Sequence, residues 1–154
     1  MNIFALDIDP EQAAKWHCDA HVEVMPKEVA QMLSTIHRIA GHHGPFYQAT
    51  HRNHPCTVWA RRSQANYRWL WRLGIFLCDE YEARYKRTHD SKFVLSLLRE
   101  CPSIVPSGKL MKFPLVMPDK YKQSNPIEAY RMFYKGEKAR GRLGRWKNNK
   151  PEWW

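Results

Sequence analysis

The side chains best suited to chemistry near the start of the chain lie between His17 and Glu28, in the stretch HCDAHVEVMPKE. His17 and His21 are four residues apart, and side chains with that spacing share one face of a helix. Glu28 follows His21 by seven residues, or about two turns of a continuous helix, which predicts the same face again. Lys27 could contact a phosphate. The stretch therefore offers either metal ligands or a carboxylate for acid–base catalysis.

A metal site would need ligands from a second segment. The stretch THRNHPC supplies His54 and Cys56, and two pairs of ligands from separate segments could complete a tetrahedral zinc site. Neither segment contains a strong zinc signature such as HExxH or paired CxxC motifs. We therefore expect no cofactor, with the histidines making hydrogen bonds near a phosphate or in a partly buried cleft. The alternative is zinc bound by His17, His21, His54 and Cys56.

Glu28 is the main candidate for a catalytic group. The four cysteines and the serines match no nucleophile signature, and no glycine-rich phosphate loop is present. Two interpretations of Glu28 stay open. It is either a carboxylate kept in a basic, aromatic cleft for acid–base work on a nucleic acid, or a first-turn acid favoured by a helix dipole.

Positive charge is concentrated in two stretches of the chain. The net charge is +10, and residues 135–150 hold seven Lys or Arg with one acid, while residues 50–73 hold five Arg and no acid. Aromatic residues lie within both stretches, a combination that favours nucleic-acid binding over a solubility tail and a solvated helix face. The residues expected to contact nucleic acid are Lys27, Asn53, His54, Arg61, Arg62, Asn66, Tyr134, Lys138, Arg140, Arg142, Arg145 and Trp146.

The composition argues against a secreted or membrane-embedded protein. The start, MNIFALDIDP, lacks the features of a signal peptide, and no stretch approaches the roughly 20 apolar residues of a membrane span. Four cysteines without a CxxC pair indicate reduced thiols, with Cys78 in the core. We expect a cytoplasmic monomer whose partner is DNA and not a membrane.

Helices must position these residues, because apolar side chains recur at helical spacing and no strand alternation is convincing. The first helix should begin at Asp9-Pro10, and Pro26 should kink it or begin a second helix. The second should end at Gly41. A third predicted helix runs from Pro55 to about Tyr85, with a bend at Gly74. A shorter helix has Ser91 as a possible cap. The last helix has Asn125 as its cap and Pro126 as its first residue.

The predicted fold is a single, mostly α domain over residues 1–154. Residues 1–100 form a helical core, residues 101–125 a proline-rich irregular connection, and residues 126–154 a C-terminal helix with a basic, aromatic tail. We expect Leu110 and Phe113 in the connection to be buried, along with Phe133. Trp59, Tyr67 and Trp69 should not all fit into so small a core.

The order of these motifs resembles that of the phage pyrimidine-dimer DNA glycosylases, the dimer-repair enzymes called endonuclease V. His21 and Glu28 match the family's histidine and catalytic glutamate, and Lys27 stands where the family has arginine. The stretch NHPCTVW resembles the family's Gly-His-Val turn, and YRMFYKGEK resembles its aromatic C-terminal segment.

The resemblance implies a small all-α enzyme of DNA repair, a glycosylase with AP-lyase activity on a damaged or modified pyrimidine. In this family the N-terminal α-amine attacks C1′ of a nucleotide in a kinked duplex with a flipped base. Family members expose a small residue after Met removal, but Asn2 is a poor substrate for that removal. The implied catalytic residues are therefore Met1, Glu28 and His21. The alternatives are a zinc-dependent enzyme that modifies nucleotides or nucleic acids and a non-catalytic nucleic-acid-binding protein.

Overall fold

Helix α1 and helix α2 meet at a break that the sequence did not predict. The computed structural model describes all residues from 1 to 154. α1 (Pro10–Trp16) begins as expected, because the Asp9 carboxylate accepts a hydrogen bond from the Gln12 amide. α2 (Asp19–Ile39) follows almost at once and runs through Pro26, so the alternative that a second helix begins at this proline is wrong.

The break at Cys18 has partners far away in the sequence. The Cys18 amide donates to the Tyr134 hydroxyl over 2.9 Å, and the Asp19 amide donates to the Arg145 carbonyl over 2.8 Å. These bonds satisfy amides that a new helix leaves free, so α2 can begin here. The bond lost at Pro26 is tolerated because the buried face of α2 is stabilised by packing.

The region predicted as one helix after Pro55 is two helices, α3 (Pro55–Ala60) and α4 (Gln64–Tyr85). The hydroxyl of Ser63 accepts a hydrogen bond from the Asn66 amide at 3.1 Å, so Ser63 caps a new helix. The other α-helices are α5 (Ser91–Leu97) and α6 (Pro126–Phe133), and Asn125 caps α6 as predicted. Ser91 is not a cap, because it is already helical.

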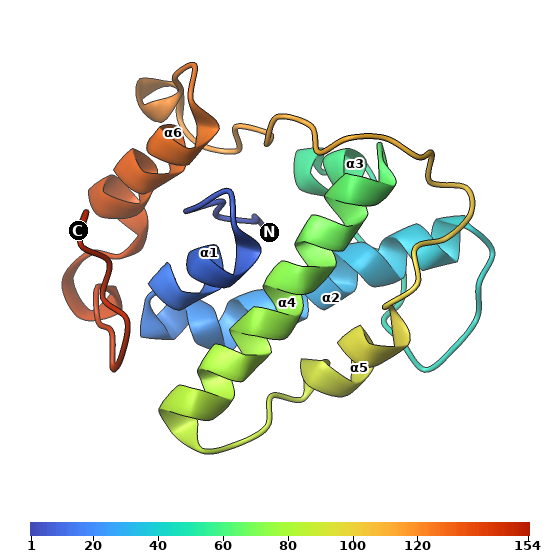
Figure 1. Ribbon diagram of the computed structural model, residues 1–154, viewed down its shortest axis with the longest axis horizontal. Helices are drawn as coiled ribbons and strands as arrows, with labels where there is room; N and C mark the ends of the chain where they lie inside the picture. The colour runs from blue at the N-terminus through green and yellow to red at the C-terminus, as the bar shows by residue number, and fades with distance from the viewer.

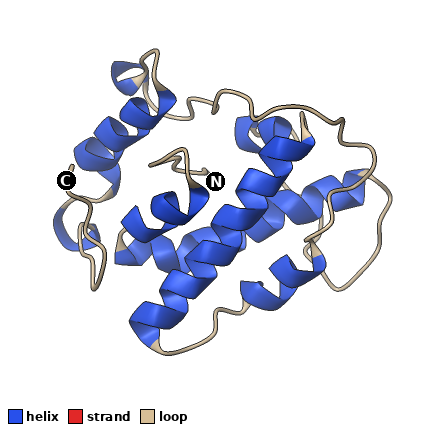
Figure 2. Cartoon of the chain, viewed as in Figure 1, coloured by secondary structure: helices blue, strands red, loops and turns tan.

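Short turns complete the chain. A 3₁₀ turn η1 (Asp119–Tyr121) lies in the proline-rich connection, a π-helical turn η2 (Tyr134–Lys138) extends α6, and a 3₁₀ turn η3 (Gly141–Leu143) begins the tail. The connection runs along the edge of the molecule from α5, past α3, to α6 (Figures 1 and 2). The structure has helices and no strands, which confirms the predicted mostly α fold. None of the helices has both the length and the apolar character needed to cross a bilayer.

α4 crosses α2 at the centre of the molecule and also packs on α1 and α5 (Figure 1). Gly74 lies at this crossing. A Cβ atom at Gly74 would stand 2.7 Å from Val29 Cγ1 and 3.0 Å from Leu95 Cδ2. The glycine therefore lets α2 and α5 approach α4 closely, and α4 continues through this position as one helix.

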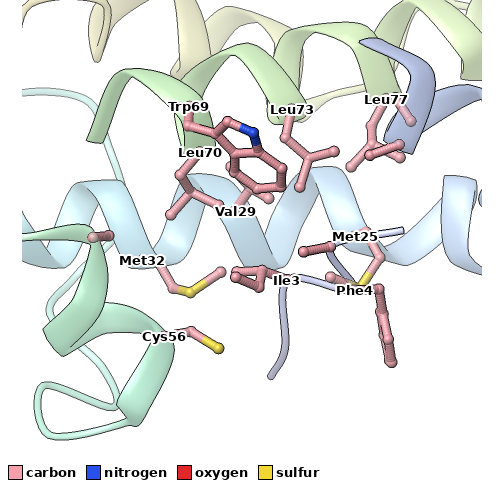
Figure 3. Packing of buried hydrophobic residues seen from close by; sticks show 14 of the residues in the cluster. Ile3, Phe4, Met25, Val29, Met32, Cys56, Trp69, Leu70, Leu73 and Leu77 are labelled. Atoms are coloured by element: carbon pink, nitrogen blue, oxygen red, sulfur yellow. The ribbon is translucent and has the colours of Figure 1, made fainter. Parts of the chain in front are cut away.

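The core joins these helices to the N-terminal segment (residues 1–8). Side chains of α4 point toward α2, and Ile3 of the N-terminal segment is drawn with Met25 and Met32 on the other side of the α2 ribbon (Figure 3). Trp59, Tyr67 and Trp69 are all buried, so the expectation that they would not fit is wrong. The N–H or O–H group of each ring donates to a backbone carbonyl, so none of these polar groups is buried without a hydrogen-bond partner.

Other predictions about burial are confirmed in part. Phe113, Phe133 and Cys78 are buried as expected, and all four cysteines are free thiols. Leu110 is 36% exposed, so its expected burial is wrong. It belongs to a part of the connection, residues 106–112, in which every residue is exposed.

The C-terminal segment (residues 139–154) docks on α1 and on the start of α2. The Trp146 indole N–H donates to the Trp16 carbonyl at 3.0 Å, and the Lys147 amide donates to the Asp19 carboxylate at 3.1 Å. The Asn149 amide group binds Glu80 on α4. The predicted tail is therefore attached to the helical core along its length.

Candidate functional site

The N-terminal segment forms a tight turn before α1. The Leu6 amide donates to the Phe4 carbonyl at 2.7 Å, which closes a three-residue turn. Phe4 adopts φ +36°, in the left-handed region that a large side chain rarely occupies. Asn2, Ile3 and Phe4 are all buried. Burial on both sides of the turn holds Met1 and Asn2 against α2.

The amine of Met1 lies beside the carboxylate of Glu28. Its nitrogen is 3.7 Å from Glu28 Oε2, and the Asn2 amide donates to the same oxygen at 3.0 Å. The Met1 side chain is 4% exposed, whereas the Glu28 side chain is 30% exposed. The pair therefore combines a fixed amine with a carboxylate that solvent or a ligand can reach.

Asn2 fixes the direction of this chain end. Its side-chain amide donates to the Val116 carbonyl at 2.9 Å, and its side-chain oxygen accepts from the Ile3 amide at 2.8 Å. Thr57 of α3 adds a weak hydrogen bond to the Met1 sulfur at 3.9 Å. Sequence reasoning did not select Asn2 or Thr57. The available signal was a polar residue inside the apolar run MNIFAL, because a buried polar side chain requires partners.

His54 belongs to the same site. It caps α3, where its Nδ1 accepts a hydrogen bond from the Cys56 amide at 3.2 Å. Burial lowers the pKa of His54, the positive charge of the Met1 amine lowers it further, and Glu28 acts in the opposite direction. The charges of the amine and of the carboxylate thus both act on His54, in opposite directions.

A groove of about 540 Å³ opens beside Glu28. Its volume lies in the range of sites that bind small molecules or single nucleotides. Most of its lining is polar or charged, and it mixes carboxylates with cationic and neutral donors. The residues are Glu23, Val24, Lys27, Glu28, Gln31, Tyr47, His89, Asp90 and Ser91.

His21 lies on α2 with Glu28 but does not reach the amine. Its ring stacks on Phe4, with centroids 4.6 Å apart, and its Nδ1 is 2.7 Å from the Tyr134 hydroxyl. Burial, followed by the charge of Lys138, lowers the pKa of His21 to about 4. A catalytic contact between His21 and the amine is therefore not present, and His21 instead supports Phe4 in the turn.

The residues of the alternative zinc site do not assemble. No group of three or more His, Cys, Asp or Glu side chains is placed to hold a metal ion. His17 is buried, its Nδ1 is bonded to the Ala13 carbonyl, and burial lowers its pKa to about 3. Burial raises the pKa of the Cys56 thiol to about 12. His21 is hydrogen-bonded to Tyr134, and His54 accepts a hydrogen bond from the first turn of α3.

Three of the residues expected to contact nucleic acid serve the fold instead. The Asn66 amide group is fully buried between the Trp59 carbonyl and the Met111 amide. Tyr134 is also fully buried, and the Trp146 indole N–H is bound to α1. These polar atoms are therefore not free to bind a ligand.

The remaining candidates are at least partly accessible. Lys138 is half-buried, with its ammonium 5.1 Å from the centre of the Phe133 ring, and Arg61 donates to the Arg52 carbonyl. His54 is half-buried at the amine. Those that are exposed are Lys27, Asn53, Arg62, Arg140, Arg142 and Arg145.

Comparisons with protein families, with curated proteins and with solved structures gave no match to this chain, so its own geometry must carry the functional argument.

Proposed function

We propose that this protein is a DNA glycosylase with AP-lyase activity, acting on a damaged or modified pyrimidine through the Met1 amine and Glu28. The single observation that carries the proposal is the distance of 3.7 Å between this amine and Glu28 Oε2. The groove beside Glu28 provides room for a nucleotide. The resemblance in residue order points to the same pair.

The placement of the amine is unusual for a chain end. Terminal residues are commonly frayed, because they lose entropy on ordering and gain few contacts. Here Ile3, Ala5 and Leu6 are fully buried, and the backbone accepts a left-handed residue at Phe4. An ordinary anchor would need neither a carboxylate at the amine nor a groove that the same carboxylate also lines.

The chemistry requires a nucleophile and a group that accepts and returns protons. The amine nitrogen bonds to C1′ as the C1′–base bond breaks, and the base leaves with that electron pair and takes up a proton. Glu28 accepts the proton that the amine loses and returns one to O4′ as the sugar ring opens to an iminium ion. Removal of a C2′ proton then expels the 3′-phosphate by β-elimination. An α-amine suits the first step because it loses its proton more readily than a lysine side chain.

Basic residues around the site support DNA as the substrate. Lys27 lines the groove next to Glu28, and His51 lies against His54 with ring centroids 6.5 Å apart. Arg52 and Arg61 are tied to each other beside these histidines in the chain. Their charges would bind the phosphates that flank the reacting nucleotide.

The decisive experiment is borohydride trapping on ultraviolet-irradiated DNA and on a duplex with an abasic site. Borohydride reduces the iminium ion and leaves the protein covalently attached. Glu28→Gln should lower turnover on irradiated DNA by at least about 100-fold, the usual effect of removing a general acid–base group. Glu23→Gln is the matched control, because Glu23 lines the same groove on the same helix and should leave turnover within about twofold.

Peptide mapping of the trapped adduct identifies the nucleophile. The expected attachment is at Met1. A chain lacking Met1 would present the Asn2 nitrogen, which lies 3.0 Å from the same oxygen, so attachment there would support the same site. Attachment at a lysine, or no adduct on either duplex, would overturn the proposal and leave a non-catalytic nucleic-acid-binding protein.

A further inference from the structure

Three arginines line a hollow at the other end of α5 from the groove. Arg68 and Arg72 lie one turn apart on α4, and Arg99 follows the end of α5. The hollow has a volume of about 200 Å³, and Trp71 and Glu100 complete its lining. Neither helix alone would form this hollow, because the packing of α5 on α4 brings the three arginines together.

The charges of these arginines are not neutralised by the protein. None of the three makes an ion pair within 4.0 Å, and Glu100 pairs with none of them although it shares the lining. Arg72 has a long contact with the Phe76 ring, at 5.6 Å. Arg84 on the same helix pairs with two carboxylates. Three neighbouring cations without a counter-ion repel one another, and an anion in the hollow would relieve that repulsion.

The chemistry of the hollow matches a phosphodiester. Guanidinium groups present planar pairs of N–H donors that bind phosphate oxygens in bidentate fashion, which an ammonium group does not do. The Trp71 indole N–H already donates to the Leu95 carbonyl at 2.8 Å, so the arginines supply the free donors. We propose that Arg68, Arg72 and Arg99 bind a backbone phosphate of DNA, as a second contact separate from the site at Glu28.

The position of the hollow allows one DNA strand to reach both sites. Ser91 at the start of α5 lines the groove beside Glu28, and Arg99 follows the end of the same helix. α5 has seven residues and is roughly 10 Å long. That length is about three nucleotides of a strand at a rise of 3.4 Å each. The inference rests on the proposed binding of DNA but not on the amine chemistry.

The test is the salt dependence of binding to an abasic DNA duplex. Arg72→Ala/Arg99→Ala removes two charges from the hollow. The matched control, Lys86→Gly/Arg87→Ala, removes two charges just beyond the other end of α4. Glycine suits position 86, where φ is +57°. Both variants should keep the fold, because all four side chains are exposed or at the surface.

We expect the hollow variant to bind the duplex at least about 10-fold more weakly at 100 mM salt, with a salt slope reduced by about 2. The control variant should retain the wild-type affinity and slope. Borohydride trapping at saturating DNA should be equal in all three proteins, because Met1 and Glu28 are unchanged. If the wild-type protein gave no trapped adduct while the two variants bound DNA as expected, the proposed function would be contradicted but the phosphate site would still be supported.

Three outcomes would overturn the inference. The first is unchanged DNA binding by the hollow variant, and the second is an equal loss in both variants, which would indicate a general charge effect. The third concerns binding to vesicles that contain phosphatidylserine, which is measured because Phe93 and Leu97 are exposed on α5, the helix that Arg99 follows. If the hollow variant loses binding to vesicles and not to DNA, the anion is a lipid headgroup.

Discussion

The two ends of the chain are both irregular, and both attach to α1 and the start of α2, but different forces hold them. The N-terminal segment is held mainly by apolar burial, with Ile3, Ala5 and Leu6 fully buried. The C-terminal segment is held by hydrogen bonds to α1, α2 and α4 and by the packing of the tilted rings of Trp146 and Trp154, with centroids 4.8 Å apart.

The two segments also present their charges differently. The N-terminal segment turns one cationic nitrogen inward to Glu28. The C-terminal segment leaves its basic side chains in solvent, namely Arg140, Arg142, Arg145, Lys147 and Lys150. Apolar packing can fix one atom for a reaction, whereas attraction to a polyanion needs only that many charges remain exposed. Under the proposed function, the N-terminal segment would carry the chemistry and the C-terminal segment would bind DNA.

Replacing Arg84 should most strongly loosen the C-terminal segment. Its buried guanidinium pairs with Asp19 and Glu80, the same carboxylates that hold Lys147 and Asn149. Arg84→Leu strands these carboxylates without a cation and should lower the free energy of unfolding by about 3–5 kcal/mol. Denaturant unfolding measures this change.

The exposed Arg87 provides the control for Arg84, since Arg87→Leu should change the free energy of unfolding by less than about 0.5 kcal/mol. A loss below about 1 kcal/mol for Arg84→Leu would show that the polar contacts of the C-terminal segment contribute little to stability.

Shortening a buried side chain should affect the N-terminal segment more than the same change in the C-terminal segment. Leu6 is fully buried, and Leu6→Ala should cost about 3 kcal/mol of unfolding free energy. Leu143→Ala is the control, because Leu143 is 51% exposed and its loss should cost less than about 0.5 kcal/mol. Equal costs in thermal unfolding would contradict the comparison.

Acid should weaken the packing of the N-terminal segment against α2 and η2. His17 and His21 lie beside Phe4 of the N-terminal segment and Tyr134 of η2. Burial lowers the pKa of His17 to about 3 and that of His21 to about 4. The histidines of the unfolded chain take up protons below their ordinary pKa of about 6.5, while those of the folded chain stay neutral until about pH 4. The free energy of unfolding therefore falls as the pH falls from about 6.5 to about 4.

Between pH 6.5 and pH 5 each buried histidine should therefore cost about 1.5 kcal/mol. His21→Gln should remove its share of this pH dependence. His43→Gln, at an exposed loop position, should leave the dependence unchanged. Urea unfolding at several pH values measures both, and a wild-type stability that does not change over this window would contradict the assignment.

The smallest expected effect concerns one hydrogen bond of the C-terminal segment. Trp146→Phe keeps a ring beside Trp154 but removes the donor to the Trp16 carbonyl. The cost should be about 1 kcal/mol, the usual contribution of one such bond. Hydrogen exchange should show faster opening at Lys147 and unchanged protection in α4. Faster exchange throughout α4 would mean that the segment does not open separately.

Local signals in the sequence predicted the helix ends that depend on neighbouring residues. Asp9 and Asn125 cap α1 and α6, and Gly41 takes φ +80° just after α2. The break before Asp19 could not be predicted in this way, because its partners Tyr134 and Arg145 are more than 100 residues away. The break before α4 was accessible, since a serine cap at position 63 is a local signal.

The candidate site shows the same division. Helical spacing placed His21 and Glu28 on one helix, but it could not show that Phe4 stacks on His21 and that Met1 reaches Glu28. The burial of Asn66 was likewise hidden, because its partner Met111 comes from the irregular connection. Sequence pattern gives the face of a helix, and tertiary contacts decide what covers that face.

The hydrogen bond between Asn2 and Val116 has a consequence for the order of events during synthesis. A ribosome makes the N-terminal segment first, yet Val116, whose carbonyl binds the Asn2 side chain, is made more than 100 residues later. Until Val116 has been made, the side-chain amide of Asn2 lacks the carbonyl to which it donates in the folded protein. The first residues of the chain can therefore reach their final position against α2 only after about three quarters of the chain has been made.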